Sequence, residues 1–116
     1  MALVLVIDQS FDSLSHLADL FETKGFDCRL ATSWKMALEH LLIESFDLIL
    51  CDYCIDGEDA IWFVRHLKTL KISSHYLVMS DDIRVKKKIP VDGYKVGFCL
   101  KPVNWHDLIG QINYKF

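Results

Sequence analysis

The sequence predicts an α/β fold in which a doubly wound sheet of five parallel strands is covered by helices on both faces. Apolar runs of strand length alternate with helical patterns along the whole chain, and five β-α units account for nearly all of the 116 residues. No linker, repeat or low-complexity segment separates them. One domain over residues 1–116, with a sizeable core, is therefore expected.

The first two units are expected to place strands over 2–8 and 26–31 and the first helix over 11–24. This helix should end at Gly25, and Ser33 should cap the second helix. The buried faces repeat at the i, i+3, i+4, i+7 spacing of a helix, through Leu14, Leu17, Ala18 and Phe21 in the first and Trp34, Ala37, Leu38 and Leu41 in the second.

The remaining strands are expected over 46–52, 75–80 and 96–100, with a loop over 53–57 after the first of them. The last helix should begin near Asn104. The faces predicted to be buried are Ala60, Phe63, Val64 and Leu67 in the third helix and Trp105, Leu108, Ile109 and Ile112 in the last.

The fourth helix is predicted to be short. Pro90 and Gly93 interrupt the stretch where it belongs, so a helix that begins at Asp82 should end at or before Ile89. One or two helical turns followed by an irregular connection are expected.

The composition is that of an ordinary soluble globular protein, with 52% hydrophobic and 25% charged residues. A net charge of -3 gives no electrostatic footprint for nucleic acid, and the run from Lys86 to Lys88 is expected to be solvated. No segment approaches the roughly 20 apolar residues of a membrane span, and the apolar N-terminus lacks the basic leader of a signal sequence. A cytoplasmic protein that binds neither nucleic acid nor membrane directly is expected.

Four cysteines raise the question of disulfides, zinc or redox chemistry. Cys51 and Cys54 form one C-x-x-C pair, but no second pair accompanies it, and Cys28, Cys51 and Cys99 lie in apolar strands. Reduced, structural thiols are therefore predicted.

Polar residues stand at the ends of three predicted strands. Asp52 closes an apolar strand, Asp8 follows the first strand and Lys101 follows the fifth. Open α/β sheets hold their chemistry at the carboxyl ends of the strands. Two acids and one lysine therefore predict a single pocket.

Four motifs resemble the receiver domain of bacterial two-component response regulators, and the resemblance covers the whole chain. The motifs are Val-Leu-Val-Ile-Asp8, Phe-Asp-Leu-Ile-Leu-Cys-Asp52, Leu-Val-Met-Ser80 and Leu-Lys101-Pro102. The resemblance implies a flavodoxin-like receiver fold. It further implies that the chain is not an enzyme beyond adding and removing a phosphoryl group at Asp52.

The resemblance assigns roles to the residues at the strand ends. Asp52 would accept a phosphoryl group from a histidine on a kinase or phosphotransfer protein. Asp8, Asp52 and the backbone carbonyl of Cys54 would hold Mg²⁺, and Lys101 would reach the phosphate. Such a transfer depends on positioning and charge neutralisation, which a divalent cation and a lysine supply.

The resemblance also implies a switch that reports to an output domain or a downstream protein. The hydroxyl of Ser80 would bond the phosphoryl group, and Phe98 would move into the space that the hydroxyl leaves. The Lys101-Pro102 peptide bond would be cis. The face around the fourth and last helices would be the output surface, which can also form a homodimer.

Three residues depart from the family pattern. Gln9 replaces a second acid and offers a metal only a neutral carbonyl oxygen, so weak Mg²⁺ binding is expected. Asp81 replaces a small residue; its carboxylate would either repel phosphate or supply the charge missing at Gln9. Asp56 replaces a proline, whereas Gly57 and Asp59 fit the pattern. An alternative is thus a pseudo-receiver that acts through protein contacts without phosphorylation.

Other functions that share parts of the pattern are excluded by residue type. A haloacid-dehalogenase-type phosphatase needs a second acid two residues beyond its nucleophile, where Ser10 and Cys54 stand. A flavodoxin needs a glycine-rich phosphate loop after the first strand, and this chain has none. The run from Asp52 to Phe63 resembles a calcium loop but lacks two of its oxygen ligands. The start at Met1 fits a stand-alone protein or an N-terminal domain.

Overall fold

Five parallel strands form one sheet in the order β2-β1-β3-β6-β7. The computed structural model describes residues 2–72, 74–89 and 96–112. The strands are β1 (Leu3–Ile7), β2 (Asp27–Ala31), β3 (Leu48–Asp52), β6 (His75–Ser80) and β7 (Val96–Leu100). This is the predicted doubly wound sheet with flavodoxin-like strand order. Differences from the predicted bounds are confined to the strand ends.

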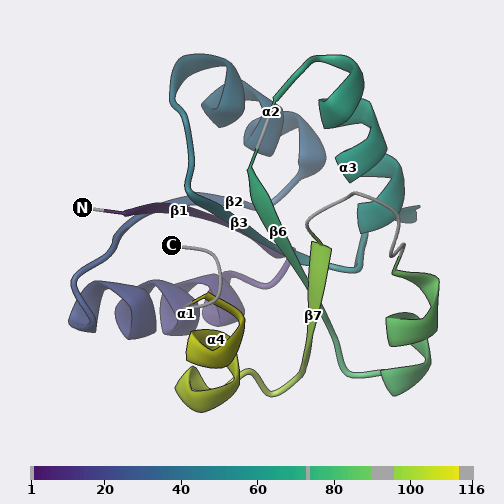
Figure 1. Ribbon diagram of the computed structural model, residues 1–116. Helices are drawn as coiled ribbons and strands as arrows, with labels where there is room; N and C mark the ends of the chain where they lie inside the picture. The colour runs from purple at the N-terminus through teal and green to yellow at the C-terminus, as the bar shows by residue number, and fades with distance from the viewer. Residues whose placement is uncertain (1, 73, 90–95, 113–116) are drawn as a thin grey trace.

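Helices cover both faces of the sheet (Figure 1), with α2 and α3 on one side and α1 and α4 on the other. They are α1 (Phe11–Thr23), α2 (Trp34–Ile43), α3 (Ala60–Thr69) and α4 (Trp105–Ile112). Ser33 caps α2 as predicted, because its hydroxyl accepts the Met36 N–H. None of the helices in the described ranges has the length and apolar character needed to cross a membrane.

The two faces of the sheet carry separate cores. On the α2/α3 side, Trp34 stacks on Phe63 with 4.6 Å between ring centroids. On the α1/α4 side, Phe21 contacts Phe26 and Trp105 edge-on. The helix residues predicted to be buried lie in these cores or against them, with three exceptions. Ala18 is buried outside the two clusters, Ile109 is half-buried, and the side chain of Ile112 lies outside the described residues.

The fourth helix is as short as predicted, but it is a 3₁₀ helix. This element, η1 (Ile83–Lys88), begins after Asp82, whose side chain accepts the Arg84 N–H. Ile89 ends it. The irregular connection predicted around Pro90 and Gly93 lies outside the described residues.

The predicted loop after β3 contains a hairpin of two short strands, β4 (Cys54–Ile55) and β5 (Glu58–Asp59). Asp56 and Gly57 form the turn with φ values of 52° and 78°. Two successive positive φ values are typical of a type I′ turn, in which Asp-Gly is a favoured pair. The prediction of a simple loop over 53–57 was therefore wrong in this detail: the Asp56-Gly57 pair is a hairpin turn signal, and two short strands flank it.

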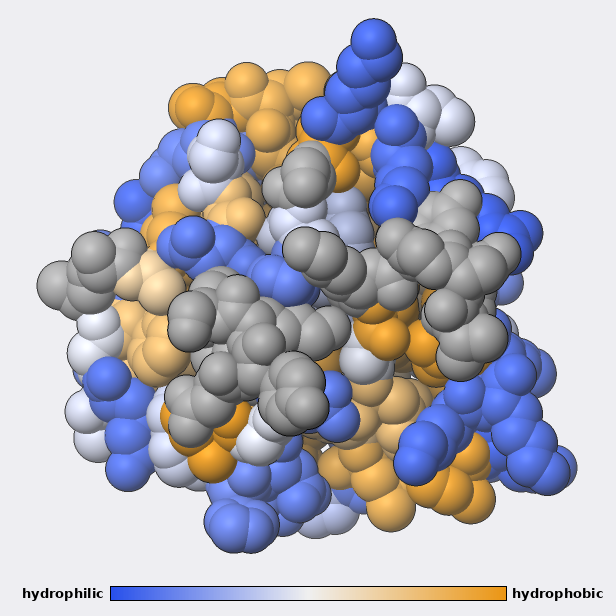
Figure 2. Space-filling view, in the orientation of Figure 1, coloured by the Kyte–Doolittle hydropathy of each residue, from blue (hydrophilic) through white to orange (hydrophobic). Residues whose placement is uncertain are grey.

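Apolar surface is exposed over α2 on the face in Figure 2. In this helix, Leu42 and Ile43 are 69% and 82% exposed. They lie at the C-terminal end of α2, which leads into the start of β3. This end of the molecule is opposite the carboxyl ends of the strands. The patch therefore takes no part in the site described below.

All four cysteines are free thiols, as predicted. Burial raises the pKa of Cys51 to about 12 and, with nearby acidic residues, that of Cys28 and Cys99 to about 11. Cys54 is exposed. The thiols of Cys28, Cys51 and Cys99 are thus poor nucleophiles at neutral pH.

Candidate functional site

Three charged side chains meet at the carboxyl edge of the sheet. Lys101 Nζ lies 3.1 Å from Asp8 Oδ2 and 3.1 Å from Asp52 Oδ1. The side chains that the sequence places at the strand ends therefore converge, with one ammonium between two carboxylates.

The strand order explains why these residues meet. β1 and β3 are paired neighbours, so Asp8 and Asp52 leave the sheet side by side. β7 lies beyond β6, and the Lys101 N–H donates to the Ser80 carbonyl over 2.8 Å, which fixes the end of β7. The Lys101-Pro102 bond is cis, as the resemblance implies. The long lysine side chain then reaches past the end of β6 to both acids.

Asp8 is buried, with only 2% of its side chain exposed. Its Oδ1 accepts the Ser10 N–H over 2.9 Å, and its Oδ2 accepts a hydrogen bond from Lys101. A buried carboxylate is stable only when such partners replace the lost water. Asp8 therefore depends on Lys101 for most of its charge compensation.

Asp52 is more accessible, with 22% of its side chain exposed. Burial is the largest influence on its pKa and raises it; the charge of Asp8 acts in the same direction, while Lys101 and the Tyr53 N–H oppose them. Desolvation therefore contributes more to the raised pKa of Asp52 than repulsion between the two acids does. Both the Lys101 and the Tyr53 contacts go to Oδ1.

Burial and the neighbouring carboxylates shift the pKa of Lys101 in opposite directions. Burial alone would lower its pKa, but hydrogen bonds to Asp8 and Asp52 and their charges outweigh burial and raise it. The lysine therefore stays protonated at neutral pH and holds a fixed positive charge beside Asp52.

Gln9 and Asp56, two of the three residues that depart from the family pattern, contact each other. Gln9 Nε2 donates to Asp56 Oδ1 over 3.1 Å, which joins the end of β1 to the hairpin turn. The sequence does not predict this contact. The Asp-Gly pair at the turn is the signal that could have placed Asp56 at the tip of a hairpin.

The Cys54 carbonyl belongs to β4, next to the same turn. Tyr53 O accepts the Ala60 N–H over 2.6 Å, and Cys54 is opposite Asp59 in the hairpin. Because hydrogen-bonded and non-bonded pairs alternate in an antiparallel ladder, the Cys54 carbonyl points away from β5. It is therefore available to another partner.

The donor set fits Mg²⁺, although only modestly. Asp8, Asp52, the Cys54 carbonyl and the Gln9 amide offer oxygen atoms, which Mg²⁺ prefers, and Mg²⁺ sites need only one or two carboxylates because the ion retains water. Within the part of the chain that the structure describes, no three His, Cys, Asp or Glu side chains gather to form a metal site. The residues fit a weakly held, partly hydrated cation.

Ser80 and Phe98 lie on the same face of the sheet. Val78 is opposite Phe98 in the β6/β7 register, and Ser80 points to the same side as Val78 because strand side chains alternate. Ser80 is 8% exposed, and its Oγ accepts the Asp82 N–H over 3.0 Å. Phe98 is half-buried against the α2/α3 core. The two predicted switch residues are thus placed on one side of β6 and β7.

A groove of about 390 Å³ opens beside the site, between α1 and the segment that follows β7. Asp81 and Lys101 lie in its wall, and Asp81 is exposed. The other lining residues are Ser13, His16, Leu17, Met79, Pro102 and Val103. The groove therefore offers a mixed polar and apolar approach to the charged site.

Comparison with known proteins agrees with this fold. The model of the response regulator receiver domain family matches residues 4–113. The transcriptional regulatory protein ZraR of Escherichia coli (strain K12) is 29% identical over 108 residues, which cover 90% of this chain and 24% of ZraR. The chain thus spans about a quarter of the length of this relative.

Solved structures share the fold. The receiver domain of the Francisella response regulator 1452 gives a TM-score of 0.84 at 24% identity and covers 98% of this chain and 95% of its own. The response regulator TrrA of Thermotoga maritima, solved in complex with Mg²⁺-BeF, gives a TM-score of 0.86 at 15% identity with full coverage of both chains. Since the family model spans nearly the whole sequence, the chain belongs to the response regulator receiver domain family and is a receiver domain of two-component signalling.

Proposed function

We propose that this receiver domain accepts a phosphoryl group on Asp52 from a phosphohistidine of a kinase or phosphotransfer partner. The observation that carries the proposal is the position of Lys101 Nζ, 3.1 Å from Asp52 Oδ1 and from Asp8 Oδ2. A lysine held there can neutralise phosphoryl oxygens as they approach the acceptor. Beyond this transfer and the hydrolysis of the aspartyl phosphate, which returns Asp52 and releases inorganic phosphate, the domain is not an enzyme.

In the transfer, an oxygen of the Asp52 carboxylate attacks phosphorus. The new O–P bond forms as the P–N bond to histidine breaks, and the histidine nitrogen keeps the bonding electron pair. Lys101 and Tyr53 engage Oδ1, which leaves Oδ2 as the oxygen that attacks. The partial exposure of Asp52 allows the donor to reach it.

Asp8, Asp52 and the Cys54 carbonyl would hold Mg²⁺, with the Gln9 amide as a further oxygen ligand. Mg²⁺, when bound, would offset negative charge on the transferring phosphoryl group. The similarity to TrrA, which was solved with Mg²⁺-BeF, supports this part of the proposal. With a neutral amide at Gln9, the binding is expected to be weak.

Ser80 would link phosphorylation to η1. Its Oγ accepts the Asp82 N–H over 3.0 Å, and Asp82 caps η1. A hydroxyl that turns to donate to a phosphoryl group must give up part of this contact. Phosphorylation would therefore loosen the start of η1 and allow Phe98 to shift, which changes the surface offered to an output domain or downstream protein.

The groove beside Lys101 would receive the donor protein. It opens at the acceptor site, and its wall includes Asp81 next to Lys101. A carboxylate at this entrance repels a phosphoryl group, so we expect transfer to be slow with small anionic donors. Contacts from a protein donor can outweigh this repulsion.

A pseudo-receiver that acts without phosphorylation is the second candidate. It is favoured by one observation, that no three acidic, His or Cys side chains gather as a metal site among the described residues. The fold and its exposed surfaces would then serve protein contacts alone.

Incubation with a small phosphodonor and Mg²⁺, followed by intact mass measurement, separates the two candidates. A phosphoryl adduct is expected on the wild type and on the control Asp19→Asn, which alters an exposed acid on α1. The adduct should be absent from Asp52→Asn. If no adduct forms at any donor or metal concentration, the pseudo-receiver is correct.

A further inference from the structure

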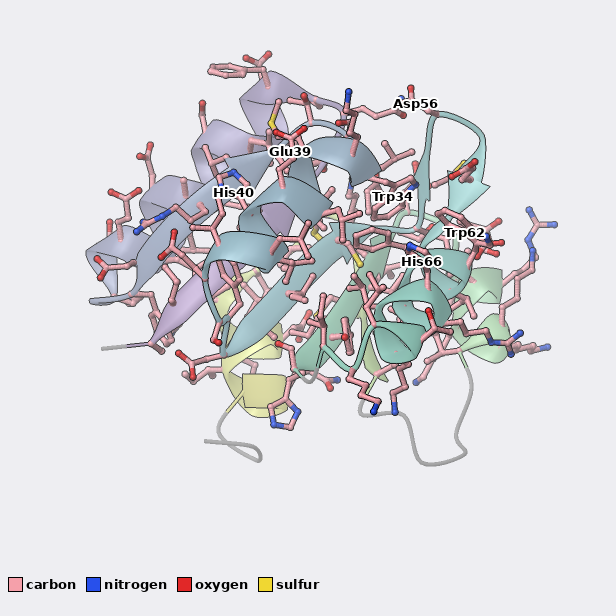
Figure 3. All side chains as sticks on the ribbon, turned by 90° about the horizontal axis from the view of Figure 1, so that it is seen from above. Trp34, Glu39, His40, Asp56, Trp62 and His66 are labelled. Carbon is pink, nitrogen blue, oxygen red and sulfur yellow. The ribbon has the colours of Figure 1, made fainter. Side chains whose placement is uncertain are left out.

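The contact between Gln9 and Asp56 joins segments 47 positions apart in the sequence. Gln9 follows Asp8 at the end of β1, and Asp56 lies at the tip of the β4–β5 hairpin (Figure 3). In the family pattern these positions hold an acid and a proline, which could not form this bond. Two exposed polar side chains, both departures from the family pattern, are thus joined beside the site.

The hairpin holds Asp56 in a defined position. Ile55 in β4 is fully buried, and the Trp34 Nε1–H donates to the Glu58 carbonyl over 3.3 Å. Asp56 and Gly57 have the positive φ values of a tight turn. The carboxylate of Asp56 is thus presented to Gln9 by an anchored element.

The bond to Asp56 also sets which way the Gln9 amide faces. Only Nε2 can donate to a carboxylate, so Oε1 is directed to the other side of the amide. An amide held through its nitrogen can offer its oxygen to a cation. A carboxylate at Gln9 would offer an oxygen as well, but it would repel Asp56 at hydrogen-bond distance.

We propose that Asp56 is a positioning residue that holds the Gln9 amide with Oε1 available to the divalent cation of the site. This inference rests on the proposed function, because it concerns Mg²⁺ held by Asp8 and Asp52. Asp56 itself acts through Gln9, since it does not join the two site acids in a three-residue metal group among the described residues. Residues that orient a metal ligand commonly determine its affinity.

A purely structural role predicts a different result. Gln9 and Asp56 are both exposed, and a hydrogen bond in water contributes little to folding stability. If the contact were purely structural, its loss would lower the unfolding midpoint equally with and without Mg²⁺. A positioning contact changes Mg²⁺ affinity and leaves the metal-free midpoint nearly constant.

The test is a titration with MgCl₂ alone at constant ionic strength, monitored by the rise of the thermal unfolding midpoint and by calorimetry. Asp56→Gly removes the carboxylate and keeps the positive φ without strain. Asp56→Asn keeps an oxygen acceptor, tolerates the same φ and removes only the charge. Gln9→Ala removes the amide, and Asp19→Asn is the control for loss of a remote exposed acid.

We expect Asp56→Gly and Gln9→Ala each to weaken Mg²⁺ binding about tenfold, as is typical when a ligand loses its positioning partner. The double variant Gln9→Ala/Asp56→Gly should bind no more weakly than either single variant, because the two residues act as one unit. Asp56→Asn and Asp19→Asn should bind nearly as the wild type does.

Wild-type affinity in Asp56→Gly would overturn the inference while leaving the proposed function intact. Equal losses in Asp56→Asn and Asp56→Gly would also overturn it, because Asp56 would then act through its charge. If the wild type itself shows no response to Mg²⁺, both the metal site and the inference are wrong.

Discussion

Removal of the Lys101 ammonium should destabilise the domain more than removal of any exposed lysine. In Lys101→Met, the buried Asp8 and the half-buried Asp52 would face each other without a cation. Breaking a buried ion pair by removing one partner costs about 3–5 kcal/mol. Because Lys101 and Asp52 keep 25% and 22% exposure, water relieves part of this cost, and we expect a loss of roughly 2–3 kcal/mol at pH 7.

The loss should depend on pH with a defined sign. The pKa of Asp52 is raised by burial, and Lys101 opposes that rise. A carboxyl group whose pKa is raised in the folded state lowers stability when it is ionised, and the penalty disappears as pH falls through that pKa. Without Lys101 the pKa of Asp52 rises further, so the penalty is largest at neutral pH and shrinks toward pH 4.

Urea unfolding at pH 7 and pH 4 measures both effects. A loss of 2–3 kcal/mol corresponds to a fall of about 8–12 °C in Tm for a domain of this size. Lys35→Met, which removes an exposed lysine on α2, is the control and should change little. A loss below about 0.5 kcal/mol, the level of an ordinary surface change, would refute this account of the site, as would an equal loss at both pH values.

Three further predictions concern the surroundings of the site. Ser80→Ala leaves the Asp82 N–H without its acceptor, so we expect about 1 kcal/mol lower stability and faster amide hydrogen exchange in η1. Unchanged exchange would contradict the link between Ser80 and η1. Gly57→Ala places a side chain at a φ of 78° and should cost about 1 kcal/mol in urea unfolding, although no atom lies within 4 Å of the added Cβ; no loss would contradict the turn assignment. A thiol reagent at pH 8 should modify the exposed Cys54 first and Cys51, with its pKa of about 12, last, as read by peptide mass; the reverse order would contradict the burial of β3.

Strand and helix order could be predicted from the sequence because each element carries its own signal. Apolar runs indicate the strands, and the polar residues that end them predict that Asp8, Asp52 and Lys101 lie at one edge of the sheet. The hairpin after β3 is not predicted, because strands of two residues are too short to show an alternation of apolar and polar residues. Its one sequence signal is the Asp56-Gly57 pair at the turn. The contact of Gln9 with Asp56 could not be predicted, because it depends on how that hairpin folds back toward β1.

One departure from the family pattern, the neutral Gln9 in place of an acid, lowers the negative charge next to Asp8 and Asp52. A single lysine offsets two carboxylates here, and a third acid in place of Gln9 would add repulsion against both Asp52 and Asp56 in the metal-free domain. The neutral amide avoids this repulsion, which favours folding without metal, but it also removes attraction for a divalent cation. Lys101 therefore carries a larger share of charge neutralisation than it would beside three acids. We therefore expect this site to bind Mg²⁺ more weakly, and the metal-free domain to be more stable, than with an acid in place of Gln9.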